Sequence, residues 1–241
     1  MKISGVFQMK QFSVVHENCA MRVNTDGCLL GAVAGANIEK EGSYHILDIG
    51  TGSGVIALQM AQRFPSSFID AVEIHGPSAK EATKNFKSSP WPDRMVCYHE
   101  PIQEFDTSTQ YDLIVSNPPF FEHGPTRANE GVANARHART LDFKALLEHT
   151  SKVLKDSGSF WCVLPFNRLE ALIEAGFEEH LFPNHILSIS PKGEKSPNRA
   201  IVALSKTNSS ETVKKDLVIY NSDNSYTEET KALLKPFYLN L

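Results

Sequence analysis

Short apolar runs alternate with amphipathic stretches along most of the chain. The apolar runs predict buried strands, and they lie at residues 46–49, 68–74, 95–98, 111–115, 159–164, 185–190 and 200–205. Stretches with helical periodicity lie between them, at residues 55–61, 79–86, 141–154 and 166–174. Because strands and helices alternate, we predict an α/β fold in which right-handed crossovers join the strands of a mostly parallel sheet.

The two ends of the chain carry further elements. Residues 7–15 fit a short strand or hairpin, and Thr25-Asp26 is predicted to start a small-residue helix over residues 28–36, with a part in cofactor binding as the alternative. Residues 216–220 predict an edge strand and residues 227–235 a final helix. We expect one domain over residues 1–241. In it, residues 1–40 cover a substrate or cofactor site, 44–206 form the core, and 207–241 form a strand–helix extension.

A glycine-rich turn follows the first strand of the predicted core. The segment Gly50-Thr51-Gly52-Ser53-Gly54 comes directly after Asp48-Ile49. Glycines permit a tight turn and let a ligand approach the backbone beside the electropositive start of a helix. The G-x-G-x-G spacing differs from the G-x-G-x-x-G fingerprint of nicotinamide dinucleotide sites. The candidate cofactor residues here are Asp48, Gly50, Thr51, Gly52 and Gly54, and a purely structural turn is the alternative.

Two acidic residues follow the next two strands. Glu73 comes about 20 residues after the glycine turn, where a carboxylate can bind the two ribose hydroxyls of an adenosine-containing cofactor. Glu100 follows the predicted strand over residues 95–98. For each of the two, a solvated carboxylate is the alternative.

The segment Asn117-Pro118-Pro119-Phe120 ends the strand over residues 111–115. Proline has no N–H for the sheet, so the chain must turn here. The turn presents an amide, carbonyl oxygens and an aromatic ring, which together suit a planar guest with an exocyclic amine. The Asn117 amide oxygen and the Pro118 carbonyl would accept its two hydrogens, and Phe120 would stack on its face. Taken alone, the tetrapeptide is equally compatible with an ordinary turn.

All of these residues follow strands of one predicted parallel sheet. Functional loops of such sheets gather at the carboxyl ends of the strands, so we expect these residues to meet at one edge. Two basic loops are candidates for contact with an RNA backbone, the loop over 121–140 also for gating of the substrate, and solvated loops are the alternative. Their residues are Arg127, Arg136 and Arg139 in the loop over 121–140, and Lys192, Lys195 and Arg199 in the hairpin loop over 191–199.

The composition narrows the class of protein only slightly. With 41% hydrophobic residues, 22% charged residues and a net charge of −4, the chain is not a broadly basic nucleic-acid coat, although a local basic patch is compatible with these numbers. The four cysteines form no C-x-x-C pair, so we predict reduced thiols and no metal. The first residues lack a signal-peptide pattern, and no run of 18 apolar residues occurs. We expect a cytoplasmic protein that contacts no membrane, and nothing in the sequence indicates an obligate protein partner.

The glycine turn, Glu73 and the Asn-Pro-Pro-Phe turn together resemble the class I S-adenosylmethionine-dependent methyltransferases that act on planar nitrogens. This resemblance implies a Rossmann-like, seven-stranded, mostly parallel sheet with an antiparallel last strand and helices on both faces. It implies S-adenosylmethionine as the cofactor, S-adenosylhomocysteine as the product, and methyl transfer without a metal. Within the class, the end segments resemble the bacterial tRNA (adenine-N6)-methyltransferase family, which acts on adenine 37 of valine tRNA. The segments that carry this match are residues 7–12, 19–27, 29–32, 216–219, 226–228 and 237–239.

The family resemblance implies roles for particular residues and has two departures. Asn117, Pro118, Pro119 and Phe120 would hold the target adenine, with Asn117 also beside the cofactor. Asn24 replaces a glycine before Thr25. Where the family has Ala-Asp-Ile after its third strand, this chain has Glu100-Pro101-Ile102, so proline replaces the aspartate that faces the cofactor adenine amine. Either Glu100 or backbone groups alone would then hold that amine.

Other functions stay open at the level of the sequence. A methyltransferase for rRNA adenine or guanine, or for the glutamine amide of a release factor, would use the same turn. A nicotinamide oxidoreductase would need the other glycine spacing and a hydride site. A non-catalytic RNA-binding module would bind RNA without consuming cofactor, because a fold alone does not establish chemistry.

Overall fold

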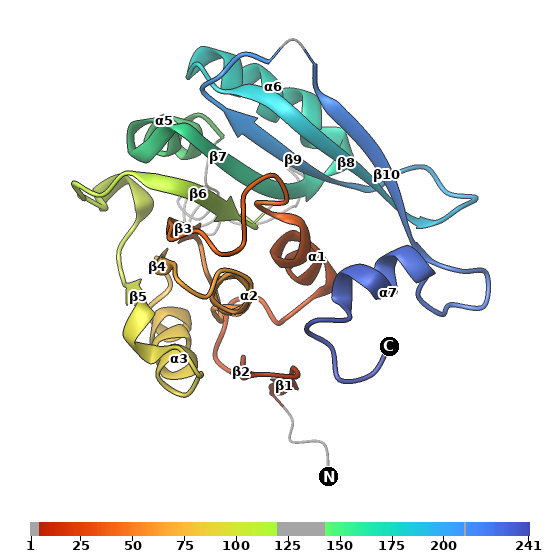
Figure 1. Ribbon diagram of the computed structural model, residues 1–241, viewed down its shortest axis with the longest axis horizontal. Helices are drawn as coiled ribbons and strands as arrows, with labels where there is room; N and C mark the ends of the chain where they lie inside the picture. The colour runs from red at the N-terminus through yellow and green to blue at the C-terminus, as the bar shows by residue number, and fades with distance from the viewer. Residues whose placement is uncertain (1–4, 120–142, 210) are drawn as a thin grey trace, which may run out of the picture.

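The computed structural model describes residues 5–119, 143–209 and 211–241, and in this part of the chain eight strands form one mixed sheet (Figure 1). The strand order is β10 (Val213–Tyr220), β8 (Phe182–Lys192), β9 (Arg199–Ser205), β7 (Leu154–Pro165), β6 (Tyr111–Ser116), β3 (His45–Ile49), β4 (Phe68–Val72) and β5 (Met95–Tyr98). Only β9 runs against the others, since it pairs antiparallel with both β7 and β8. The predicted fold class is confirmed. The sheet has one strand more than predicted, because β10 extends it by pairing in parallel with β8.

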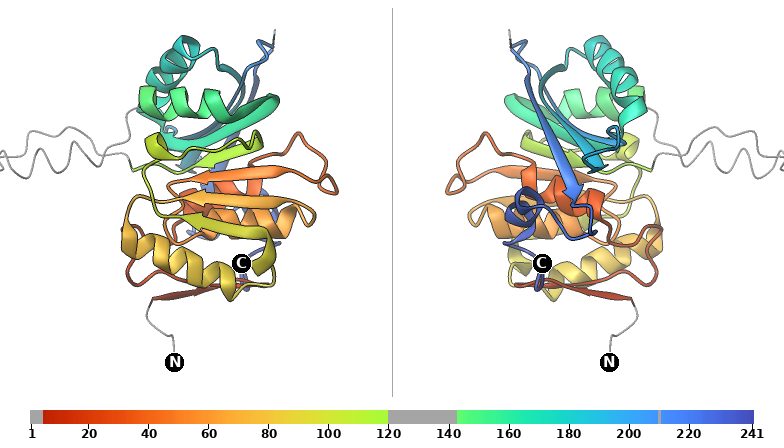
Figure 2. Two further views of the ribbon diagram at one scale, coloured as in Figure 1. Left: turned by 90° about the vertical axis from the view of Figure 1, so that its left-hand side faces the viewer. Right: turned by 90° about the vertical axis from the view of Figure 1, so that its right-hand side faces the viewer.

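Helices cover both faces of the sheet (Figures 1 and 2). One face carries α1 (Thr25–Val33), α2 (Val55–Arg63), α3 (Gly76–Lys87) and α7 (Glu228–Leu234), and the other carries α5 (Phe143–Val153) and α6 (Leu169–Glu178). In β3, Ile46 belongs to the apolar cluster of the first face, and Leu47 and Ile49 belong to that of the second. Successive strand residues point to opposite faces, so a strand covered on both sides must be apolar throughout. This is the physical basis of the continuous apolar runs in the sequence.

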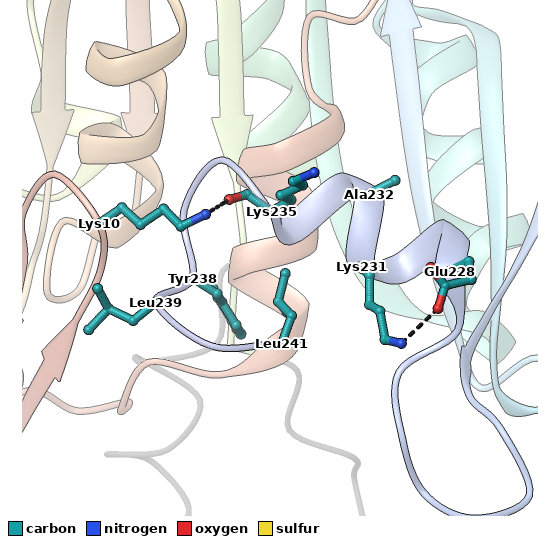
Figure 3. A pocket seen from close by; sticks show the side chains of 8 residues that line it. All are labelled: Lys10, Glu228, Lys231, Ala232, Lys235, Tyr238, Leu239 and Leu241. Carbon is teal, nitrogen blue, oxygen red and sulfur yellow. Dashed lines mark hydrogen bonds and ion pairs between the residues drawn. The ribbon is translucent and has the colours of Figure 1, made fainter.

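The hairpin near the N-terminus and the C-terminal segment lie side by side. β1 (Val6–Gln8) and β2 (Ser13–Val15) form the predicted hairpin, and the backbone N–H of Lys10 donates to the Phe237 carbonyl at 2.7 Å. A shallow pocket of about 380 Å³ lies beside this contact (Figure 3), where the Lys10 ammonium donates to the Lys235 carbonyl at 2.6 Å. None of the residues that we predict for the site lines this pocket.

Three short 3₁₀ segments complete the described elements: η1 (Pro92–Arg94), η2 (Ile102–Glu104) and η3 (Phe166–Arg168). Several boundaries differ from the sequence prediction by a few residues, and two of these differences have a local cause. The cap of α1 is Asn24, whose Oδ1 accepts from the Gly27 N–H at 2.9 Å, so Thr25 and Asp26 lie inside the first turn. β7 begins at Leu154 rather than near residue 159, because an irregularity in its pairing with β6 absorbs residues 155–158.

The described residues include four cysteine thiols, of which Cys28 and Cys162 are buried, and none of the four forms a disulfide. In the described ranges, no helix has the length and apolar character that crossing a membrane requires.

Candidate active site

The carboxyl ends of β6, β3 and β4 bring predicted site residues to one edge of the sheet. The last residues of these three strands are paired with one another in register, so Asn117, Gly50 and Glu73 leave the sheet at the same level. Neighbouring strands lie about 4.8 Å apart, which places these three positions within about 10 Å. β3 is flanked by β4 on one side and by β6 on the other, so this edge is the switch point at which open α/β sheets bind ligands.

The glycine turn between β3 and α2 is held in a conformation that favours glycine. Gly50, Gly52 and Gly54 have φ angles of +71°, +58° and +84°. A Cβ at Gly50 or Gly52 would meet no atom within 4 Å, whereas a Cβ at Gly54 would come to 2.4 Å from Phe86. The first two glycines therefore border open space that a ligand can fill, and the third permits close packing of α3 against the turn.

Glu73 fixes the glycine turn from the neighbouring strand end. The residue is 8% exposed, and its Oε2 accepts from the Gly52 N–H at 2.8 Å while Oε1 accepts from the His75 N–H at 2.7 Å. Each carboxylate oxygen can accept more than one hydrogen bond, so Glu73 can hold the turn and still bind two hydroxyls. The hydrogen bond from the glycine turn to Glu73 was not predicted from the sequence.

Asp48 lies behind the turn and has no exposed surface. Its Oδ2 accepts from the Thr51 hydroxyl at 2.6 Å and from the Ala57 N–H at 3.2 Å, while Oδ1 has no partner among the described residues. Burial raises the pKa of Asp48 to about 7, against the hydrogen bonds from Thr51 and Ala57, and the charge of Glu73 raises it further. Asp48 thus joins the turn to the start of α2, and the structure places it out of direct reach of solvent.

Replacing Asp48 by asparagine is expected to flatten the pH dependence of stability. The folded state holds the Asp48 proton up to about pH 7, whereas the unfolded chain releases it near pH 3.8. The contribution of this group to the free energy of unfolding is therefore complete below pH 4 and falls as the pH rises towards 7. The loss from this one group approaches about 1.4 kcal/mol per pH unit inside that window. Urea unfolding of the ligand-free protein and of Asp48→Asn between pH 5 and 8 measures it. Parallel pH profiles of the two proteins would contradict the prediction.

The Asn117 turn is attached to both β3 and α1. The Ser116 hydroxyl donates to the Ile49 carbonyl at 2.9 Å, which ties the end of β6 to the start of the glycine turn. A Cβ on Gly27 would lie 3.5 Å from Asn117 Nδ2, so the Asn117 amide rests against the first turn of α1. Asn117 and Pro119 are half-buried and Pro118 is buried. The described residues offer the Asn117 side chain no hydrogen-bond partner, which leaves its amide available to a guest.

The remaining candidates divide into three groups. Glu100 is half-buried just after β5, at the same edge of the sheet. The hairpin loop between β8 and β9 also lies at this edge, since β8 ends there and β9 begins there. Phe120, Arg127, Arg136 and Arg139 lie outside the described residues.

In the hairpin loop, two of the three predicted RNA contacts are already engaged within the protein. Arg199 Nε pairs with Asp26 Oδ2 at 2.8 Å, and the Lys192 ammonium donates to the Ser222 carbonyl at 3.1 Å. Lys195 is exposed. The loop is therefore held against the first turn of α1. The same turn rests against the Asn117 amide through Gly27. Asp26 and Arg199 are 173 positions apart, so no local pattern in the sequence could reveal the pair.

The family model described as Methyltransferase small domain matches residues 33–182. Solved structures support the same fold. A protein described as a predicted O-methyltransferase from Agrobacterium tumefaciens aligns with 90% of this chain and 100% of its own at a TM-score of 0.68 and 14% identity. The methyltransferase subunit of a type I restriction-modification system from Streptococcus thermophilus covers 80% of this chain and 46% of its own, with a TM-score of 0.55 and 18% identity. The family model spans more than half of the chain, and the protein is therefore a methyltransferase of the small-domain type with a class I, Rossmann-like fold.

Curated relatives define the family more narrowly. Proteins from Christiangramia forsetii and Pedobacter heparinus are 37% and 39% identical to this chain, and each alignment covers 98% of this chain and 98% or 99% of the relative. A protein from Parabacteroides distasonis is 38% identical over 98% of both chains. All three carry the name tRNA1(Val) (adenine(37)-N6)-methyltransferase. This chain belongs to that family, as the end segments of its sequence predict.

Proposed function

We propose that this protein transfers the methyl group of S-adenosylmethionine to N6 of adenine 37 in tRNA1(Val). The observation that carries the proposal is the Asn117 amide, which has no partner among the described residues and stands at the same level of the sheet edge as Gly50 and Glu73. The names of the curated relatives supply the substrate. Since this substrate is a tRNA, we expect the protein to act in the cytoplasm.

The residues at the edge fit the cofactor. Gly50 and Gly52 border open space, Glu73 has free acceptor capacity, and Ile74 offers an apolar side chain that is 61% exposed directly after Glu73. Glu73 would hold the ribose hydroxyls, Ile74 would cover one face of the adenine, and the glycine turn would lie along the amino-acid part. When bound, S-adenosylmethionine supplies a methyl group made electrophilic by the adjoining sulfonium.

The chain's own task is to place and polarise the amine that is to be methylated. The Asn117 amide oxygen and the Pro118 carbonyl would accept the two N6 hydrogens, which draws the nitrogen lone pair out of conjugation with the ring. The remaining rate acceleration comes from holding the base in line with the methyl group, because positioning alone can lower the activation barrier of a transfer between two bound groups by several kcal/mol. The predicted stacking of Phe120 on the base belongs to this proposal. The proton leaves the nitrogen to water after transfer, when that nitrogen is cationic and acidic.

We also propose that residues 15–20, here called the N-terminal segment, form a wall of the cofactor site. Three polar side chains on the buried face of α3 anchor it. Asn85 accepts from the Val15 N–H at 3.0 Å and donates to both the Val15 carbonyl and the Ser53 carbonyl of the glycine turn at 2.8 Å. Glu81 accepts from Asn18, and Ser78 accepts from the Ala20 N–H at 3.1 Å. Residues 15–20 are thus tied to the helix that follows Glu73, beside the proposed ribose site.

The hairpin loop would contact the RNA backbone through Lys195, with Lys192 and Arg199 as further contacts. The Asp26–Arg199 pair gives Arg199 a positioning role as well, since it holds the loop against α1. Arg127, Arg136 and Arg139 stay predicted RNA contacts.

The test is methyl transfer from labelled S-adenosylmethionine to unmodified total tRNA, followed by nucleoside analysis and by mapping of the modified nucleotide. We expect N6-methyladenosine at position 37 of tRNA1(Val). Label that appears only in rRNA or in a release factor would move the assignment to another planar nitrogen. Cofactor binding without label in any of these substrates would contradict a catalytic function.

Glu100→Gln tests whether this residue replaces the missing aspartate. If the Glu100 carboxylate accepts from the cofactor adenine amine, the substitution is expected to raise the KM for S-adenosylmethionine about three- to tenfold and to leave kcat unchanged, because it weakens one partly exposed hydrogen bond. Steady-state kinetics at saturating tRNA measure both constants. Because the glutamine oxygen can still accept a hydrogen bond, Glu100→Ala is measured beside it, and an unchanged KM in both variants would indicate that backbone groups alone hold the adenine.

A further inference from the structure

The outward face of α3 carries a stripe of lysines. Lys80, Lys84 and Lys87 are all exposed, and at 100° per residue they lie within about 60° of one another around the helix axis. The stripe runs from about 6 Å to about 17 Å along the helix from its first residue, at 1.5 Å per residue. Because α3 begins three residues after Glu73, the stripe starts about one helical turn beyond the sheet edge that carries Glu73.

No acidic side chain of α3 offsets these lysines at the surface. Glu81 is the one acidic residue of the helix, and it is only 5% exposed. Its Oε2 accepts from the Asn18 N–H at 2.9 Å and from the Cys19 thiol at 3.1 Å, and its Oε1 accepts from the Asn18 amide at 2.9 Å. The hydrogen bonds of the carboxylate are thus directed to the N-terminal segment. Against the effect of burial, and after these hydrogen bonds, Lys84 still contributes to lowering the pKa of Glu81, but no acidic side chain of α3 is exposed beside the three lysines.

Some cations of the described ranges are paired with carboxylates, and others, such as Lys195 and Lys214, are exposed without such a pair. Ion pairs with carboxylates engage Lys152, Lys155, Arg199, Lys206 and Lys231. Within the same ranges, no such pair forms at Lys80, Lys84 or Lys87. The exposed Arg22 lies near His16 on the N-terminal side, where it lowers the pKa of that histidine, second to burial. Glu17, also near His16, is an acidic neighbour on the N-terminal segment.

We propose that Lys80, Lys84 and Lys87 bind the phosphate backbone of the tRNA outside the active site. The proposal rests on the proposed function, since the polyanion is the tRNA whose adenine enters the site. The stripe places three exposed lysines without an ion-pair partner among the described residues on one side of α3, although the net charge of the protein is −4, and its chemistry matches a chain of phosphates. Lysine ammonium groups are point charges that hold phosphates without reading bases, so the stripe would orient the RNA rather than select the nucleotide.

The lysines also have a role that requires no RNA, because Lys84 and Lys87 lie in the last turn and complement the helix dipole. The experiment must separate this effect on stability from RNA binding. The affinity of the full-length protein for unmodified tRNA1(Val) is therefore measured at a series of KCl concentrations with S-adenosylhomocysteine present. The K80A/K84A/K87A variant is compared with K40A/K214A/K215A, which removes the same charge from exposed lysines in the loop before β3 and in the first half of β10.

In the α3 variant, the slope of log Kd against log salt is expected to fall by about 2 to 3, at about 0.7–0.9 for each phosphate contact. The control variant is expected to keep the slope of the unaltered protein, and S-adenosylhomocysteine affinity should be unchanged in both. If the triple variant is too unstable to measure, K80A alone, which lies outside the last turn, should lower the slope by about 0.7–0.9.

Equal slopes for the α3 variant and the control would overturn the proposal. If the unaltered protein binds and methylates the tRNA while the slopes are equal, only this inference fails. If the unaltered protein does not bind the tRNA at all, both this inference and the proposed function are wrong.

Discussion

Asn117→Ala is expected to lower kcat for methyl transfer by about 10²- to 10³-fold and to leave the affinity for S-adenosylhomocysteine within about twofold. The size is that of removing one preorganised hydrogen-bond group which acts on the reacting nitrogen. The affinity should survive because β6 still ends at Ser116, whose hydroxyl continues to hold the glycine turn through the Ile49 carbonyl. Any backbone contact of residue 117 with the cofactor also survives loss of the side chain.

Single-turnover kinetics with saturating tRNA, together with calorimetric titration of S-adenosylhomocysteine, separate the two effects. Asn37→Ala is the matched control, because Asn37 is an exposed asparagine in the loop after α1. It should leave both quantities unchanged. A loss of cofactor affinity in Asn117→Ala that equals its loss of kcat would show that the side chain binds the cofactor, and its assignment to the target amine would then be wrong.

The parts of the site that follow from local sequence could be predicted from the sequence alone. A run of apolar residues, a glycine turn and a resumed helical period specify β3, the turn and α2 within a few residues. The order of such units also fixes which strand ends share an edge, because parallel strands with right-handed crossovers leave few arrangements. This is why Gly50, Glu73 and Asn117 could be expected to meet before any coordinates were known.

The parts that depend on contacts between distant segments could not be predicted. The Asp26–Arg199 pair and the bonds of Asn85 to β2 join residues between 70 and 173 positions apart. A single sequence carries no periodicity that reports such pairs. Polar residues on a predicted helix are expected to face solvent. The sequence therefore did not indicate that Ser78, Glu81 and Asn85 lie buried against the N-terminal segment. The final strand was expected as an edge strand, and only its parallel pairing with β8 shows that it enlarges the main sheet.

These long-range contacts converge on α1 and the glycine turn. The hairpin loop is attached to Asp26, the N-terminal segment is attached through Asn85 to Ser53, and Asn117 rests against Gly27. The proposed cofactor wall, RNA loop and target turn therefore share supports. A substitution that moves the glycine turn is expected to affect cofactor and RNA together, whereas one that trims a side chain facing the ligand should affect one of them. Experiments on this site must make that distinction for each residue.

Glu73→Ala is the substitution for which the distinction matters most. Its carboxylate holds the Gly52 N–H and the His75 N–H and is also the proposed partner of two ribose hydroxyls. Hydrogen bonds to a charged group are worth about 1.5–3 kcal/mol each, so the loss of both hydroxyl contacts is expected to raise the Kd for S-adenosylhomocysteine by about 10²-fold or more. Glu104→Ala, which removes an exposed carboxylate from η2, should leave the Kd unchanged.

A cofactor analogue without the two ribose hydroxyls separates direct contact from collapse of the turn. If Glu73 binds the hydroxyls, the unaltered protein should lose about 10²-fold in affinity for the analogue, while Glu73→Ala should bind S-adenosylhomocysteine and the analogue about equally. If Glu73 only holds the turn, removing the hydroxyls should weaken binding to both proteins by the same factor. That second result would contradict the ribose assignment and would leave Glu73 as a support of the glycine turn. These four affinities give the coupling free energy between the Glu73 side chain and the two ribose hydroxyls. A general loss of stability does not affect this coupling free energy, because each protein's affinity for the analogue is compared with its own affinity for S-adenosylhomocysteine.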